Sequence, residues 1–212
     1  MTNELTPENA LIFRITHIDN VPSILENGLC CRNSENYPGY HEIGNPDLID
    51  RRADRVVPVF PQGNLSDYIP FYFTPFSPML LNIKTGHNNI TQRPMSEIVI
   101  LVSSLHTLLA QRHGFLFTDR HAVIGYARFY NDLNDLGQID WRALQARDFR
   151  RDPQNPEKME RYQAEVLVYQ HLPVQVLDKV ICYDSEAEGK VRSWMKTSGI
   201  GVNVVTAREW YF

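Results

Sequence analysis

The run from Glu97 to Val102 places five apolar, mostly β-branched residues in succession, and it is the clearest buried strand in the chain. Shorter strands are expected over 13–15, 115–117, 166–169, 180–183 and 202–205. Short helical segments separate these strands, without a regular alternation of strand and helix. This order predicts a mixed α+β core rather than a doubly wound parallel sheet.

Helices are expected where a capping residue or a proline opens an apolar run. The segment 21–25 has Asp19 or Asn20 as its cap and ends at the turn signal Asn27-Gly28. Prolines exclude a central strand throughout 68–81, which therefore predicts a strand, a turn and the start of a helix. Further helices are expected over 104–111, 121–133 and 186–196.

The long segment 31–65 is polar, rich in Pro, Gly and Asn, and without clear periodicity. It is expected to be a loop. A loop of this length in a compact domain is more often functional or mobile than a simple connection.

Length and composition predict a single soluble domain over 1–212. The 212 residues are 43% hydrophobic and 22% charged, and no apolar run reaches the roughly 20 residues that a membrane span needs. The start of the chain lacks the basic and apolar regions of a signal peptide. Three cysteines, two of them adjacent, form neither a disulfide framework nor a zinc spacing. A reducing cytoplasm is expected.

The net charge of -4 argues against a uniformly basic nucleic-acid-binding protein, but it permits a local anion site. The arginines gather in two segments that are both expected to be loops. These clusters are Arg51, Arg52 and Arg55, and Arg142, Arg147, Arg150 and Arg151. They are either solvated faces or binding sites for an anionic substrate.

Several chemistries lack their sequence signature. There is no Gly-x-Gly-x-x-Gly or Walker loop and no Gly-x-Ser-x-Gly elbow. The seven histidines are scattered without metal-ligand spacing, so no metal is expected. The residues that remain as candidates are His17, the segment 72–74, His121 and Glu165, each at the expected end of an element. Taken singly, each also fits a structural role, as a core histidine, a core aromatic residue or a charge at a strand end.

One long motif carries a resemblance. The segment 67–80 (Asp-Tyr-Ile-Pro-Phe-Tyr-Phe-Thr-Pro-Phe-Ser-Pro-Met-Leu) resembles the signature of the DarT family, the DNA ADP-ribosyltransferase toxins of DarT-DarG toxin-antitoxin systems. The similarity runs nearly end to end and is greatest to the enterobacterial branch that modifies thymidine. Further matching segments, in chain order, are 16–20 with 24–25 and 27–29, 43–46, 118–122, 145–149, 161–165 and 210–212.

The resemblance implies an ADP-ribosyltransferase fold, related to poly-ADP-ribose polymerases, with a split mixed sheet that binds NAD+ in a cleft. By position, Glu165 matches the catalytic glutamate of the family. The NAD-binding set implied in the same way is His17, Asn20, Tyr72, Thr74 and His121. Many members have histidine where this chain has Arg14.

Arg52 matches the arginine that faces the target base, with the adjacent Arg51 as the other possible register. The loop 147–162 corresponds to the substrate-recognition loop. In that loop Arg147, Arg150 and Arg151 are expected to contact phosphates, and Phe149 or Tyr162 to stack on a base.

The implied activity is NAD+-dependent, sequence-specific transfer of ADP-ribose to thymidine in single-stranded DNA, which blocks replication and serves in defence against phage. The implied protein partner is the macrodomain antitoxin DarG, with no membrane involved. Two alternatives stay open: transfer to another base, RNA or protein, or simple NAD glycohydrolysis; and a non-catalytic module that binds nucleic acid.

Overall fold

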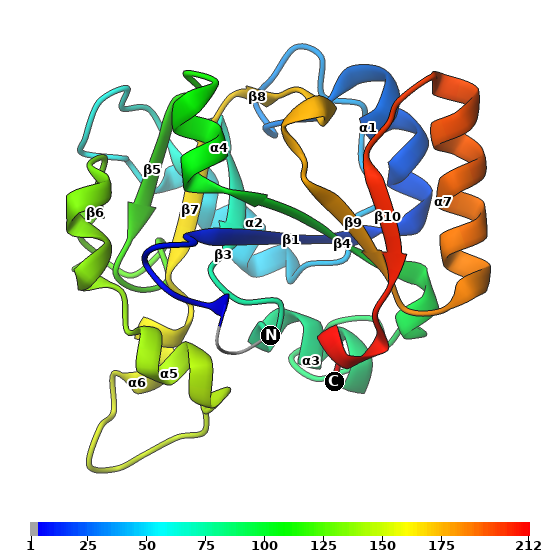
Figure 1. The fold of residues 1–212 in the computed structure, drawn as a ribbon. Coiled ribbons are helices and arrows are strands. Elements are labelled where there is room, and N and C mark those ends of the chain that lie inside the picture. Colours follow the sequence, from blue (N-terminus) through cyan, green and yellow to red (C-terminus); the bar gives the residue numbers. More distant parts are fainter. Residues whose placement is uncertain (1–3) are drawn as a thin grey trace.

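A computed structural model describes residues 4–212 (Figure 1). Eight strands form one sheet in the order β10-β9-β4-β1-β3-β7-β5-β6, and β2 and β8 form a separate pair. Neighbouring strands are antiparallel except β9 and β10, which are parallel. The strands of the large sheet are β1 (Leu11–His17), β3 (Tyr68–Tyr72), β4 (Ile98–Ser104), β5 (Phe115–Thr118), β6 (Phe129–Tyr130), β7 (Glu165–Tyr169), β9 (Lys179–Cys182) and β10 (Asn203–Thr206). The separate pair is β2 (Leu29–Cys30) and β8 (His171–Leu172).

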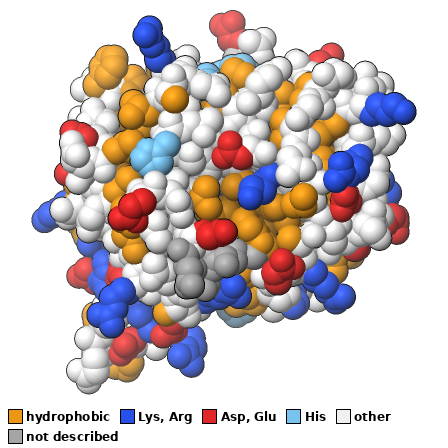
Figure 2. Space-filling model, viewed as in Figure 1, with side chains coloured by type: hydrophobic (Ala, Val, Ile, Leu, Met, Phe, Trp, Pro, Cys, Tyr) orange, Lys and Arg blue, Asp and Glu red, His pale blue; other side chains and the backbone are white. Residues whose placement is uncertain are grey.

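Short helices surround the sheet. They are α1 (Val21–Asn27), α2 (Pro46–Asp54), α3 (Pro78–Thr85), α4 (Leu105–Ala110), α5 (Trp141–Ala146), α6 (Lys158–Tyr162) and α7 (Ser185–Ser198). Figure 1 shows α1 and α7 side by side at the β9–β10 end of the molecule, and α5 and α6 together at the opposite end. Figure 2 shows the same face with its side chains, where apolar and charged groups are interspersed. Within residues 4–212, every helix is too short or too polar to cross a membrane.

The large sheet is split between β1 and β3. β1 pairs with β4 along its whole length, but it pairs with β3 only at Phe13 and Tyr72. Extending that register would place Ile15 opposite Pro70, which has no N–H to donate. The carbonyl of Pro70 instead accepts a hydrogen bond from Arg14 Nη1 at 2.9 Å. The two halves of the sheet therefore separate at this point, in agreement with the split mixed sheet that the family resemblance implies.

Most of the expected elements are present. The apolar run after Glu97 forms β4, in which every residue is buried. The proline-rich segment gives β3, a turn and α3, whose cap is Ser77. Pro70 does lie within a central strand, β3. It pairs with Leu167 of β7 on one side, but on the other side the pairing with β1 does not extend to it.

The helix expected over 121–133 is wrong. Arg128 N, which a helix would bond to a carbonyl four residues earlier, donates instead to the carboxylate of Asp119, and residues 129–130 pair with β5. The segment forms turns, then β6, and then a 3₁₀ helix over Leu133–Gln138. An amphipathic pattern alone did not reveal this competition for hydrogen bonds.

The expectation of a continuous loop over 31–65 is also wrong, because the segment contains α2. Asn45 caps this helix by accepting from Leu48 N, and Pro46 occupies the first turn. No residue of α2 is fully buried, and Leu48 and Ile49 are its only large apolar residues, so the segment reads as polar and its short apolar face does not stand out in the sequence. Arg51 and Arg52 therefore lie on a helix and not in a loop. The segments that form α5 and α6 were also expected to be loops, and this expectation is wrong in the same way.

The hydroxyl of Tyr211 joins two strands inside the core. It lies 2.9 Å from Ile98 O and 3.0 Å from Ile181 O, so it donates to one of these carbonyls at a time. We expect Tyr211→Phe to lower the free energy of unfolding by about 1–2 kcal/mol, because a buried acceptor loses its donor. Urea denaturation measures this change. Tyr183→Phe is the control, since no hydrogen bond involves the Tyr183 hydroxyl among the described residues, and an equal loss there would contradict the prediction.

Candidate active site

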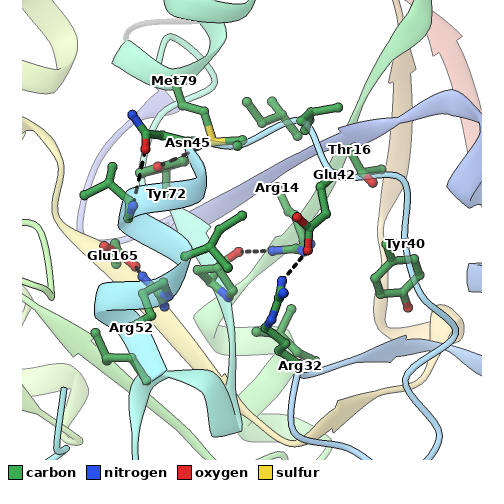
Figure 3. A pocket seen from close by; sticks show the side chains of 18 of the residues that line it. Arg14, Thr16, Arg32, Tyr40, Glu42, Asn45, Arg52, Tyr72, Met79 and Glu165 are labelled. Atoms are coloured by element: carbon green, nitrogen blue, oxygen red, sulfur yellow. Dashed lines mark hydrogen bonds and ion pairs between the residues drawn. The ribbon is translucent and has the colours of Figure 1, made fainter. Parts of the chain in front are cut away.

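A cavity of about 300 Å³ opens where β1 and β3 separate. Figure 3 shows side chains converging on it from β1, from the segment that leads into α2, from α2 itself and from β3. Glu165 and Arg52 lie at one end of this view and Tyr40 at the other. The split in the sheet thus produces the cavity.

Glu165 is the first residue of β7 and faces Tyr72 on β3. It is only 1% exposed, and its carboxylate is held by groups from two distant segments. Arg52 Nη1 donates to Oε2 at 2.7 Å, and Ala122 N donates to Oε1 at 3.1 Å. His121 Nδ1 lies 3.1 Å from Oε1. The side chain is therefore fixed in one orientation at the edge of the cavity.

The charge of Glu165 depends on these neighbours. Burial by itself raises the pKa of a carboxyl, but Arg52, His121 and the Ala122 N–H outweigh it and leave the pKa of Glu165 below its ordinary value. Burial lowers the pKa of His121. The site thus pairs an ionised carboxylate with a neutral imidazole at pH 7. Val123 N donates to His121 Nδ1 at 3.3 Å, so the proton of the neutral imidazole lies on Nε2.

Tyr72 lines the same cavity, opposite Glu165. Burial and the nearby Glu165 carboxylate raise the pKa of its hydroxyl well above the ordinary value, so the hydroxyl stays protonated. Arg52, His121, Tyr72 and Glu165, predicted from well-separated parts of the sequence, all line this cavity.

Asn20 also lines the cavity, but its amide is fully engaged. Its Nδ2 donates to Thr16 Oγ1 and His41 O, while its Oδ1 accepts from His41 N at 2.7 Å. These bonds hold the segment around His41 against β1. Asn20 occupies the position before α1, but its amide makes no capping hydrogen bond to the helix, so the side-chain cap expected from Asn20 is absent.

His17 and Thr74 lie outside the lining of the cavity, although the resemblance placed both at NAD+. His17 is 3% exposed, and its ring stacks on His41 with centroids 4.0 Å apart. It faces a separate neighbouring cavity. Thr74 is buried and accepts from Phe76 N, so it shapes the turn after β3.

His17, Asp19 and His41 bring three possible metal-ligand atoms within 4.8 Å of one another. Their chemistry does not suit a cation. Asp19 N already donates to His17 Nδ1, and Arg93 Nη2 lies 2.9 Å from His41 Nε2. The guanidinium charge opposes a metal ion at this position.

The arginines of the expected recognition loop lie outside the cavity. Arg150 and Arg151 are exposed, and Arg150 pairs with Asp148. Arg147 is exposed at the end of α5 and has its guanidinium 3.6 Å from the centre of the Phe76 ring. Arg51 is exposed on α2 and does not line the cavity, unlike Arg52. Of the two adjacent arginines, Arg52 is therefore the one that reaches the cavity.

The stacking role expected of Tyr162 is wrong for this structure. Tyr162 is 1% exposed, its hydroxyl donates to Phe76 O at 3.1 Å, and burial raises its pKa to about 12. Its ring packs against Phe149, which is half-buried. Only Phe149 of the pair has a surface that a base can reach.

Other residues of the cavity were not singled out from the sequence as site residues. The cavity residues missed in this way include Arg32, Tyr40, Glu42, Asn45 and Met79. Asn45 does lie within the motif 43–46 that contributes to the family resemblance, and Met79 within the motif 67–80. The others occupy segments with no pattern of their own, and only the fold brings them to the cavity.

A split mixed sheet, with an ionised glutamate buried at the edge of its cleft, defines the ADP-ribosyltransferase class of site. A family model described as "ssDNA thymidine ADP-ribosyltransferase, DarT" matches residues 13–212. A DNA ADP-ribosyl transferase from Escherichia coli O127:H6 is 52% identical over 209 residues, which are 98% of this chain and 96% of that protein. The chain belongs to the DarT family.

Solved structures agree with this assignment. Thermus sp. 2.9 DarT in complex with ADP-ribosylated ssDNA has a TM-score of 0.90 and 35% identity, covering 97% of this chain and 98% of that one. The same protein in complex with NAD+ has a TM-score of 0.84 and 34% identity, covering 97% and 99%. The predicted family and fold class are confirmed.

The Arg52–Glu165 pair gives a prediction about stability. Arg52→Gln leaves a buried carboxylate without its cation, and we expect a loss of about 3–5 kcal/mol in the free energy of unfolding at pH 7. Only 14% of the Arg52 side chain and 2% of the Glu165 side chain are exposed, so solvent screens the pair little. Urea denaturation at several pH values measures the loss.

The pH dependence follows from the pKa of Glu165. In the native protein this pKa is lowered, so the carboxylate contributes stability above its ordinary pKa, and the contribution is lost as pH falls through the lowered value. In the variant, burial raises the pKa, and protonation on acidification relieves the cost. The difference between the two proteins should therefore shrink as the pH falls toward the ordinary pKa of a carboxyl. A constant difference contradicts this, and exposed Arg51→Gln is the control, expected within about 0.5 kcal/mol of the native protein.

Proposed function

We propose that Glu165 is the catalytic carboxylate with which this NAD+-dependent transferase moves ADP-ribose onto thymidine in single-stranded DNA. The observation that carries this role is the buried, ionised Glu165 at the edge of the cavity, held by Arg52, His121 and Ala122 N. A fixed negative charge next to a cavity suits a reaction that develops positive charge.

The reaction breaks the bond between nicotinamide and C1′ of its ribose, and the electron pair leaves with nicotinamide. Positive charge then develops on the ribose. A carboxylate bonded to a ribose hydroxyl stabilises this charge more than it stabilises the neutral ground state, and this difference accelerates the step. A ring nitrogen of thymine forms the new bond to C1′ and releases its proton.

Arg52 supports the second half of the reaction. Its Nη1 is bonded to Glu165, while its Nη2 is buried and without a partner among the described residues. This free donor suits a carbonyl oxygen of the target base, whose ring N–H becomes more acidic beside a cation. The proton passes to Glu165, whose carboxylate lies at the site.

Single-stranded DNA is the suitable substrate because pairing in a duplex blocks the edge of the base that must react. Arg147, Arg150 and Arg151, with Arg51 on α2, supply exposed positive charge for the phosphates, and Phe149 supplies a partly exposed ring for stacking. Sequence preference then comes from the bases that this loop admits.

We infer that the protein acts as a single-domain toxin, 1–212, neutralised by a macrodomain antitoxin of the DarG type. Membership of the DarT family supports both inferences. Modified template bases block replication, which suits a role in defence against phage. NAD+ and replicating DNA meet in the bacterial cytoplasm, and this supports a cytoplasmic location.

Incubation with NAD+ and a thymidine-containing oligonucleotide should add the mass of one ADP-ribose to a thymidine. We expect Glu165→Gln to lower kcat by about 100- to 1000-fold or more, because a preorganised charge is lost at the transition state. Mass spectrometry of the oligonucleotide measures the product. DNA binding should remain, which separates an enzyme from a binding module.

Two controls accompany this experiment. Glu26→Gln removes an exposed carboxylate of α1 outside the cavity lining and should leave kcat unchanged. Release of free ADP-ribose without labelled oligonucleotide indicates a glycohydrolase, and labelled guanine overturns only the choice of base. Full activity of Glu165→Gln overturns the role of this carboxylate.

The recognition loop gives a second prediction. The double substitution Arg150→Ala, Arg151→Ala should reduce the slope of log affinity for single-stranded DNA against log salt by about 0.7 for each phosphate that the loop no longer neutralises. The KM for NAD+ should not change, because both arginines lie outside the cavity. Lys196→Ala on α7 is the control. An unchanged slope in the double variant counts against this loop as the phosphate-binding surface.

A further inference from the structure

Arg14 on β1 lines the cavity and has no acidic partner. The other arginines and glutamates of the lining form two pairs, Arg52 with Glu165 and Arg32 with Glu42. Within residues 4–212, no carboxylate lies within 4.0 Å of the Arg14 guanidinium. The cavity therefore carries one positive charge that the protein itself does not neutralise.

The guanidinium of Arg14 makes one hydrogen bond to the protein, and one of its other donors has no partner. Its Nη1 donates to Pro70 O at 2.9 Å, across the gap between β1 and β3. Its Nε is buried and without a partner in the described part of the chain. Burial lowers the pKa of Arg14, yet an arginine in a protein keeps its proton. A buried cation with an unused donor at the wall of a cavity is a site for an anion.

The place of Arg14 in the cavity indicates which anion. Figure 3 shows Arg14 between Glu165 and Arg52 on one side and Thr16 and Tyr40 on the other. The reacting ribose must lie at Glu165 if that carboxylate acts on it. The pyrophosphate is the middle of the dinucleotide and its only anionic group, so it falls between the two ends of the cavity.

We propose that Arg14 binds the pyrophosphate of NAD+, with the contact to Pro70 O fixing the orientation of the guanidinium. This inference rests on the proposed function, in which NAD+ occupies this cavity. A phosphate of the DNA backbone is the less favoured source, because Arg14 lies between two strands of the sheet whereas the exposed arginines lie on the loop 147–162. Arginine geometry suits paired phosphate oxygens, and a charge-assisted bond of this kind is among the stronger polar contacts.

The test compares ligands with and without phosphate on three proteins. Calorimetry measures binding of ADP-ribose, adenosine and nicotinamide to the native protein, Arg14→Gln and Arg14→Lys. We expect Arg14→Gln to weaken ADP-ribose binding about 10- to 100-fold and to leave adenosine and nicotinamide unchanged. Arg14→Lys keeps the charge without the planar fork, so its loss should be smaller. It also serves as the readout if the glutamine variant does not fold.

Other outcomes overturn the proposal. Unchanged affinity for ADP-ribose in both variants contradicts it. An equal loss of affinity for adenosine also contradicts it, because that result indicates a deformed cavity. Loss of affinity for single-stranded DNA with ADP-ribose binding intact assigns Arg14 to a DNA phosphate instead. Arg112→Gln, an exposed arginine after α4, is the matched control and should change none of these affinities. If the native protein binds neither ADP-ribose nor NAD+, the proposed function fails as a whole, and this result is distinct from a failure at Arg14.

Discussion

Between β1 and β3 the sheet is joined by a single residue pair, Phe13 with Tyr72, and the cavity exists because the pairing goes no further. Pro70 has no N–H for a ladder at the next position on that side, and its carbonyl accepts from Arg14. A backbone that cannot complete its hydrogen bonds thus creates the space that the chemistry uses.

The cavity edge then gathers groups that are far apart in the chain. Arg52 arrives on α2, His121 and Ala122 on a turn after β5, and Glu165 at the start of β7. A carboxylate that is 1% exposed stays ionised because Arg52 and the Ala122 N–H donate to it. The same arrangement that makes the charge tolerable also orients it toward the cavity, so stability and function depend on one cluster.

Much of the fold followed from local pattern. The apolar run of β4, the proline signals before α3 and the glycine at the end of α1 identify these elements because each has a direct backbone reason. The helix over 121–133 failed because Asp119 accepts from Arg128 N and residues 129–130 pair with β5, which uses groups that a helix would have bonded internally. The helix α2 was missed because it is polar overall and offers only Leu48 and Ile49 as large apolar residues. Burial of Tyr162 was missed because an aromatic residue beside a basic loop fits either a core or a stacking surface.

The sequence by itself determined the class of fold, the family, the strand that follows Glu165 and the chemical types available to the site. Tertiary structure decided which of two adjacent arginines reaches that glutamate, and that Asn20 positions a loop while His17 and Thr74 lie outside the main cavity. It also decided that Arg14 stands in the cavity without a counter-charge. Local patterns report backbone preference and burial, whereas the partner of a charged side chain depends on which distant segment the folded chain brings within a few ångströms.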